Sequence, residues 1–284
     1  ASIIQAFNAM PSCFSLPSVA NNRPVVCVKD TDNATITGFT VDGLGLGNTN
    51  NRFYGIAFRN AGGTVQDSVV RDIRNTPFDG VQHGVGIYAY NDDATARTLH
   101  ILDNTITGFQ KNGITTNASA TNPLIVDIQR NTVTGQGATT ITAQNGIQVN
   151  TPAGSGVVAD NTISGIAYDN TDSATKWVAT SILNFYSDVE TTGNVITGAH
   201  MGIYYYEGRG LIEDNDLTIE KIGVYAYGIN AADPPQAVPS PIDSPVSKKA
   251  TAAVSSAAPV NAVEIAHNTL TFEGTDHSST YAIE

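Results

Sequence analysis

The segment Asp103-Asn104-Thr105-Ile106-Thr107-Gly108 is one copy of a phrase that returns through most of the 284-residue chain. Each full copy places an asparagine before a variable residue, an aliphatic residue and a Thr-Gly or Ser-Gly pair, and looser copies lack the glycine. An internal repeat of this kind indicates a protein built from small stacked units. The asparagines of the copies are Asn104, Asn131, Asn161, Asn194, Asn215 and Asn268.

A second phrase, a Gly-Ile pair that opens a strand-like run, lies between successive copies of the first. A short apolar run also precedes each asparagine, so each unit holds three short strands rich in strand-forming Thr, Val and Ile. One unit is too small to bury its own apolar face, and neighbouring units must therefore stack into a solenoid. The pairs are Gly55-Ile56, Gly86-Ile87, Gly113-Ile114, Gly146-Ile147, Gly202-Ile203 and the variant Gly223-Val224.

This order of strands and asparagines resembles the pectate-lyase-like superfamily of right-handed parallel β-helices, over roughly residues 33–284. In that fold a ladder of asparagines marks the tight turn between the second and third strands, and asparagine tolerates the left-handed conformation. The resemblance predicts an all-β, single-stranded right-handed parallel β-helix, a solenoid of about eight coils. It predicts the fold more strongly than the function, because this fold hosts many activities.

Two segments of the chain fall outside the repeat. Residues 1–32 are interrupted by prolines and are predicted to form an irregular N-terminal cover over the open edge of the first coil. Residues 231–260 are rich in Pro, Ala and Ser, and the repeat resumes at Asn261, so they are predicted to be a loop insertion in one coil. The chain stops in a strand-like run at Glu284, and we expect a longer natural protein or another element over this end.

Composition excludes several classes of protein. The formal net charge is −12 and the chain has no basic stretch, which argues against nucleic-acid binding. No apolar window is long enough for a transmembrane helix, so no membrane-spanning segment is expected. Charged residues make up only 14% of the chain and hydrophobic residues 41%, which argues against wholesale disorder.

The chain contains two cysteines, Cys13 and Cys27. In an exported protein they would form one disulfide that closes a short loop, and the alternative is a pair of buried free thiols. The chain begins at Ala1 without a methionine, which fits either a processed mature protein or a trimmed one. We expect an extracellular or cell-surface protein, with the periplasm as a further option.

Strand alternation assigns the outward-facing residues of each Gly-Ile strand. If the isoleucine points inward, the next residue and the residue two beyond it point outward, and six of the 11 tyrosines fall on this one face. In the resembled family the polysaccharide lies here, and tyrosine rings suit stacking on sugars. The alternative is a structural ladder of rings with no ligand. The predicted substrate-binding residues are Tyr88, Tyr90, Trp177, Phe185, Tyr204, Tyr225 and Tyr227.

Candidate catalytic residues lie beside this face. A uronate lyase needs a cation that neutralises the substrate carboxylate and a base that removes the C5 proton. Tyr206 or His200 is the candidate base, Arg209 or Lys176 the candidate cation and Glu207 the candidate acid. The alternative is a solvated loop with a surface Glu-Arg pair.

A second polar cluster comprises Asp79, His83, Tyr88 and Tyr90 with the acidic turn at residues 91–93. This Asn-Asp-Asp turn makes Ca²⁺ a candidate cofactor, although calcium takes six to eight oxygen ligands and the metal-binding residues are not assigned. The strand-borne acids of calcium-dependent pectate lyases and the Asp-pair and Gly-His-Gly pattern of polygalacturonases are both missing from the sequence.

The predicted function is binding of, and action on, an extracellular polysaccharide, most simply as a polysaccharide lyase (a carbon-oxygen lyase) on a uronate-containing glycan. The alternatives are a non-catalytic carbohydrate-binding adhesin and a structural surface module. The acidity of the chain disfavours polyanionic substrates unless cations such as Arg209 and Lys176 gather at the binding face.

Overall fold

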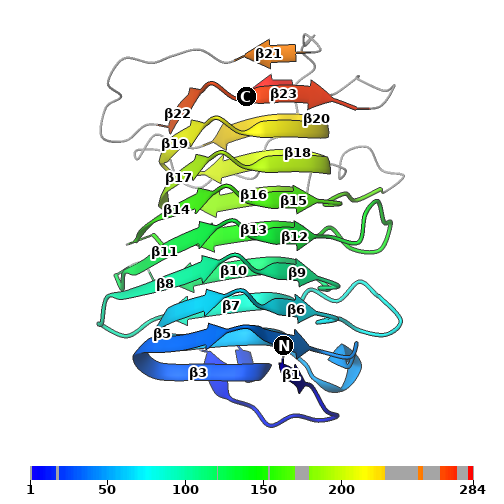
Figure 1. The fold of residues 1–284 in the computed structure, drawn as a ribbon, viewed down its shortest axis with the longest axis vertical. Helices are drawn as coiled ribbons and strands as arrows, with labels where there is room; N and C mark the ends of the chain where they lie inside the picture. The colour runs from blue at the N-terminus through cyan, green and yellow to red at the C-terminus, as the bar shows by residue number, and fades with distance from the viewer. Residues whose placement is uncertain are drawn as a thin grey trace.

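The computed structural model describes residues 2–16, 19–119, 121–152, 154–169, 179–227, 249–251, 263–273 and 281–283. Strands follow one another along an elongated axis, with the N-terminal strands at one end and the C-terminal strands at the other (Figure 1). Within the described ranges the single helical element is a short 3-10 turn, Gly47–Thr49. No helix in these ranges has the length and apolar character needed to cross a membrane.

The Gly-Ile strands form the first of three stacks, in which each strand pairs in parallel with its equivalent in the next coil. Parallel pairing between equivalent strands is what the repeat predicts, and the parallel β-helix is confirmed. The strands of this first stack are β3 (Val19–Thr37), β5 (Phe53–Gln66), β7 (Val85–Asn91), β10 (Asn112–Ala118), β13 (Asn145–Asn150), β16 (Thr180–Phe185), the second half of β18 (Val195–Tyr206), the second half of β20 (Asp216–Tyr227) and β24 (Tyr281–Ile283).

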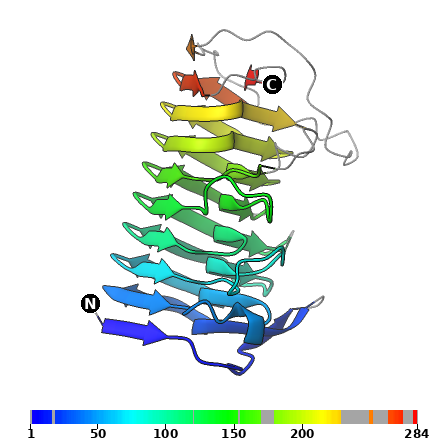
Figure 2. The same ribbon diagram turned by 90° about the vertical axis from the view of Figure 1, so that its right-hand side faces the viewer.

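The apolar run before each asparagine forms the second stack, and it begins with the last residues of β3 and β5. Figure 1 shows this stack rising along one side of the molecule, and Figure 2 shows the regular spacing of the coils from the side. The other strands of the second stack are β8 (Arg97–Leu102), β11 (Leu124–Gln129), β14 (Ser155–Ala159), β17 (Asp188–Thr192), β19 (Gly210–Glu213) and β22 (Val263–Ala266).

The strands that follow the asparagines form the third stack, again by parallel pairing. Two further strands pair in the antiparallel sense, β2 (Phe14–Leu16) with β3 and β21 (Lys249–Thr251) with β23. The third stack contains β1 (Ser2–Gln5), β4 (Phe39–Asp42), β6 (Val69–Arg71), β9 (Thr105–Thr107), β12 (Thr132–Thr134), β15 (Thr162–Ser164), the first residues of β18 and β20, and β23 (Thr269–Phe272).

A column of aliphatic side chains from the Gly-Ile strands fills the interior. These side chains are at most 2% exposed, and the inward residues of the other two stacks pack against them. Burial of this continuous core provides the apolar contact that no single coil could supply. The column contains Ile56, Ile87, Ile114, Ile147, Ile182, Ile203 and Val224.

The asparagine ladder runs along one corner of the solenoid. Each Asn side-chain amide donates to the Oδ1 atom of the next Asn, at 3.0 Å from Asn104 to Asn131 and 2.8 Å from Asn215 to Asn268. The amide of Asn104 also donates to the carbonyl oxygen of Val65 at 2.9 Å. Backbone N–H groups complete the ladder, and the N–H of Ser68 donates to the Oδ1 atom of Asn104 at 3.0 Å.

The left-handed residue at this corner is the one before each asparagine, which corrects the expectation that the asparagine itself takes that conformation. Asp103 has φ 56° and Asp214 has φ 54°. The asparagines are buried because their amides make the ladder, so the exposed neighbour makes the turn instead. The corner residues are Asp103, Arg130, Asp160, Gly193, Asp214 and His267.

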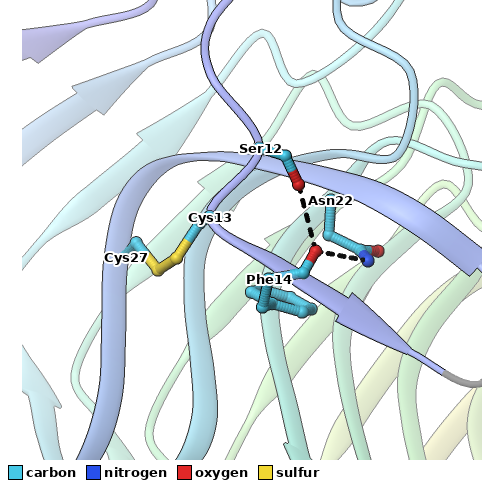
Figure 3. The surroundings of a disulfide bond; sticks show 5 residues. All are labelled: Ser12, Cys13, Phe14, Asn22 and Cys27. Carbon is cyan, nitrogen blue, oxygen red and sulfur yellow. Dashed lines mark hydrogen bonds between the residues drawn. A yellow bond between two sulfur atoms is a disulfide. The ribbon is translucent and has the colours of Figure 1, made fainter.

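Regular stacking begins before residue 33, because β1 pairs with β4 and residues from Arg23 onward pair with β5. A hairpin of β2 and β3 carries the disulfide between Cys13 and Cys27, whose Cα atoms lie 6.5 Å apart (Figure 3). The side-chain amide of Asn22 holds the hairpin by donating to the carbonyl oxygen of Phe14 at 3.1 Å. The predicted insertion at 231–260 lies outside the described residues, apart from β21.

Candidate functional site

The outward residues of the first stack lie in two columns, as strand alternation predicts. The inward neighbours belong to the main core, whereas the outward residues form separate apolar clusters at the two ends of the stack. Pairing between strands sets these columns. One contains Ala57, Tyr88, Thr115, Gln148, Leu183, Tyr204 and Tyr225, and the other contains Arg59, Tyr90, Asn117, Asn150, Phe185, Tyr206 and Tyr227.

The C-terminal ring cluster, Phe185, Tyr204, Tyr206, Tyr225 and Tyr227, packs ring against ring. The Tyr204 and Tyr225 centroids lie 4.9 Å apart and those of Tyr206 and Tyr227 lie 5.5 Å apart. Tyr204, Tyr206 and Tyr225 are 4%, 7% and 6% exposed, while Phe185 and Tyr227 are half-buried. Burial raises the pKa of the Tyr204 and Tyr206 hydroxyls. These buried ring faces favour the interpretation as structural packing.

An N-terminal ring cluster covers the other end of the same face. Phe14 from the disulfide hairpin (Figure 3) stacks on Tyr54 and Tyr88, whose centroids are 4.5 Å apart. Tyr88 is 7% exposed, and burial raises its pKa to about 12. Tyr90 is half-buried, and the Arg59 guanidinium lies 5.3 Å from its ring centroid. The hairpin therefore closes this end of the predicted binding face.

The predicted catalytic residues contact different parts of the molecule. His200 is buried, its Nδ1 atom accepts from the Tyr168 N–H at 3.0 Å and its Nε2 atom lies 3.2 Å from the Glu220 carboxylate. The Arg209 guanidinium pairs with Asp188 of the second stack at 2.7 Å, whereas Tyr206 belongs to the ring cluster.

Glu207, the candidate acid, forms the turn after β18. It takes a left-handed conformation with φ 49°, and its N–H donates to the Tyr227 carbonyl oxygen at 2.7 Å. Lys176 and Trp177, the remaining members of the predicted site, lie outside the described residues.

The acids of the second predicted cluster are engaged elsewhere. The Asp79 carboxylate accepts from the Asn75 amide at 2.7 Å and from the Val81 N–H at 3.1 Å. In the acidic turn, Asp92 accepts from the Arg59 guanidinium at 2.8 Å and Asp93 pairs with Arg97. Arg59 and Arg97 thus neutralise the two carboxylates of the acidic turn.

One other group in the described part of the chain has metal-ligand spacing. Glu213, Asp214 and His267 place one ligand atom each within 4.8 Å of one another at the ladder corner. The His267 Nδ1 atom lies 2.8 Å from the Glu213 carboxylate, so the imidazole already has a partner. The histidine and two carboxylates offer a donor set suited to a transition metal better than to calcium.

A hollow lies on the outer face of the second stack, where one strand carries shorter side chains than the strands on either side of it. β14 presents the small residues Ser155 and Val157, and the neighbouring strands carry longer side chains in the same registers. The result is a cavity of about 420 Å³ with Ile125 and Asp127 on one wall and Asp188 and Glu190 on the other.

A second cavity of about 420 Å³ continues this hollow toward the N-terminal coils, and the two share Thr98 and His100. Together they form the second-face groove, which runs from β3 past β5, β8, β11, β14 and β17 to β19. At about 4.8 Å a step, these six steps between strands give a length of about 29 Å.

Charged side chains are spread along the second-face groove. The His100 Nδ1 atom and an Asp127 carboxylate oxygen lie 2.9 Å apart, and the Gln129 amide donates to the other oxygen of Asp127. Arg97 pairs with Asp32 at 3.0 Å. Carboxylates outnumber cations along the groove, and Glu190 is exposed.

The sequence patterns do not predict this groove, because outward-facing residues are assigned only for the Gly-Ile strands and not for the apolar run. Strand alternation is the signal that could have found it. In the apolar runs, buried aliphatic residues alternate with less buried ones, which are Thr98 and His100 on β8 and Ile125 and Asp127 on β11.

Searches of protein-family models, of curated proteins and of solved structures find no match for this chain. The second-face groove and its side chains therefore carry the functional inference.

Proposed function

We propose that this protein binds an extracellular polysaccharide along the second-face groove. The observation that carries the proposal is the continuity of the two cavities, which share Thr98 and His100 and cross successive coils. A small ligand needs one deep pocket that encloses most of its surface. An open trough of about 29 Å suits an extended polymer that crosses one strand after another.

The side chains of the groove match the mixed character of a sugar chain. Ile125 is 42% exposed and offers an apolar surface to the C–H face of a sugar ring. Thr98 and Ser155 offer hydroxyl groups, and His100 and Asp127 offer a hydrogen-bonded pair at 2.9 Å. Such alternation of apolar and hydrogen-bonding groups orients a ligand and gives specificity.

The extracellular setting rests on the disulfide between Cys13 and Cys27, because such bonds persist in oxidising compartments. The parallel β-helix, with its resemblance to the pectate-lyase-like superfamily, adds support for a polysaccharide ligand. That support is fold-level analogy, whereas the groove supplies the chemical argument.

Uronate lyase activity stays a prediction. The carboxylates Asp127, Asp188 and Glu190 would repel a uronate in this groove, and Arg209 is paired with Asp188. A panel of uronate polymers, followed by the ultraviolet absorbance of the unsaturated product, tests β-elimination directly. Accumulation of that product would extend the proposal from binding to catalysis.

The test of binding is obstruction of the groove. Ser155→Trp places a large ring on the exposed floor, and we expect it to weaken oligosaccharide binding at least tenfold without a change in thermal unfolding. Thr132→Trp is the matched control, because Thr132 is also an exposed strand residue but lies on the third stack. Calorimetry against neutral and charged oligosaccharides measures both. Failure of every oligosaccharide to bind the unmodified protein would overturn the proposal.

A further inference from the structure

One column of the second stack places carboxylates on alternate strands. Asp127 pairs in register with Val157, and Val157 with Glu190. Glu190 lies level with Leu211, because Asp188 pairs with Arg209 and Thr191 with Ile212. Leu211 pairs in turn with Glu264. Acidic and apolar side chains therefore alternate along the solenoid axis in the order Asp127, Val157, Glu190, Leu211 and Glu264.

The spacing of this column is set by the β-sheet. Adjacent strands lie about 4.8 Å apart, so successive carboxylates are about 9.6 Å apart. One strand step is close to the length of one sugar in an extended β-1,4-linked chain, and neighbouring sugars in such a chain face opposite ways. Every second sugar then presents the same substituent to the protein, in step with the carboxylates.

Charge decides which substituent fits. Asp127 and Glu190 line the groove, and Asp32 and Asp188 add further negative charge along it. Arg97 and Arg209 each pair with one of these acids, Asp32 and Asp188 respectively. The groove therefore attracts a cationic polymer and repels a polyanion.

We propose that the ligand of the second-face groove is an extended β-1,4-linked amino-sugar polymer with free amines. The ammonium groups of alternate sugars pair with Asp127 and Glu190 inside the groove and with Glu264 on β22, one strand beyond its end. The sugar rings between them rest on Val157 in the groove and on Leu211 at its β19 end. This inference rests on the proposed polysaccharide binding and adds the charge and the repeat of the ligand.

The test compares two hexasaccharides of equal length, a β-1,4-linked glucosamine hexamer and its fully N-acetylated counterpart. We expect the amine form to bind the intact protein about tenfold more tightly, because three partly exposed ion pairs each contribute modestly. The advantage should shrink as salt is added.

Three variants locate the binding. Glu190→Gln and Asp127→Asn should each lower the affinity for the amine hexamer by about two- to fivefold. Glu273→Gln is the matched control, because it removes one exposed negative charge at the end of β23, on the third stack, and should leave the affinity unchanged. Thermal unfolding of each variant checks the fold.

The outcomes separate this inference from the proposed function. Equal binding of the two hexamers, abolished by Ser155→Trp, would overturn the inference and leave polysaccharide binding standing. Equal weakening by Glu190→Gln and Glu273→Gln would also overturn it, because general attraction to an acidic protein would then explain the preference. Binding of neither hexamer, nor of any other oligosaccharide, would overturn both.

Discussion

The outer faces of the first and second stacks differ although the same coils build both. On the first stack, tyrosine rings fill the space between coils and bury one another, with Tyr204 4% exposed. On the second stack, Ser155 and Val157 stand between longer side chains and leave a cavity of about 420 Å³. In a solenoid with uniform strand spacing, a hollow therefore marks a strand with small outward side chains between two strands that carry longer ones. A column of aromatic residues instead marks a face that packs on itself.

The largest expected effect tests whether the rings are packing or binding groups. Tyr206→Ala should lower the free energy of unfolding by about 3 kcal/mol, because it removes a ring that contacts Tyr204 and Tyr227. Oligosaccharide binding should be unchanged. Urea unfolding and calorimetry measure the two quantities. A loss of oligosaccharide binding with unchanged stability would instead place the binding site on the outer face of the first stack.

A smaller effect follows from ionisation of the rings. Burial raises the pKa of Tyr88 to about 12, above the value near 10 of an exposed tyrosine. The folded state therefore holds this proton more tightly, and the free energy of unfolding should fall as pH rises from about 10 to 12, by at most about 2 to 3 kcal/mol. Tyr88→Phe should flatten this dependence, and a slope unchanged by the substitution would contradict the assignment.

The smallest expected effect concerns the hydroxyl groups of two adjacent tyrosines in β18. Tyr205→Phe should destabilise the protein by about 1 to 2 kcal/mol, because the hydroxyl contacts the Val189 carbonyl oxygen at 2.8 Å and Thr191 at 2.7 Å. Tyr204→Phe should leave stability unchanged or slightly raised, because that buried hydroxyl has no hydrogen-bond partner among the residues that the structure describes. Thermal unfolding of the pair measures the contrast, and equal destabilisation would contradict it.

The fold was predictable because its determinants are local and repeated. The asparagines and the Gly-Ile pairs each mark one position per coil, and strand alternation placed Tyr204 and Tyr206 on the outer face. The sequence pattern places the left-handed conformation on the asparagine, whereas the residue before it adopts that conformation. The reason is not local, because Asn104 is buried by a hydrogen bond to the coil that stacks on it.

The site was less predictable because it depends on relations between coils. Ser155 forms part of the floor of the groove and Glu190 part of its wall only because β14 pairs with β17. His200, Tyr206 and Arg209 are close in sequence, but the turns between the stacks send them to Glu220, to the ring cluster and to Asp188. Loops of variable length carry no periodic signal from which those directions could be read.

The last rung of the asparagine ladder has a consequence for how such a chain can grow. Asn215 donates to Asn268 at 2.8 Å across a sequence separation of 53, whereas Asn194 donates to Asn215 at 2.9 Å across 21. The rung geometry is the same in both cases, so the register does not depend on how much polypeptide separates two rungs. Doubling the length of a closed loop costs only about 0.6 kcal/mol. The connection between β20 and β22 is therefore a natural point for evolution, or for an engineer, to splice in an additional module.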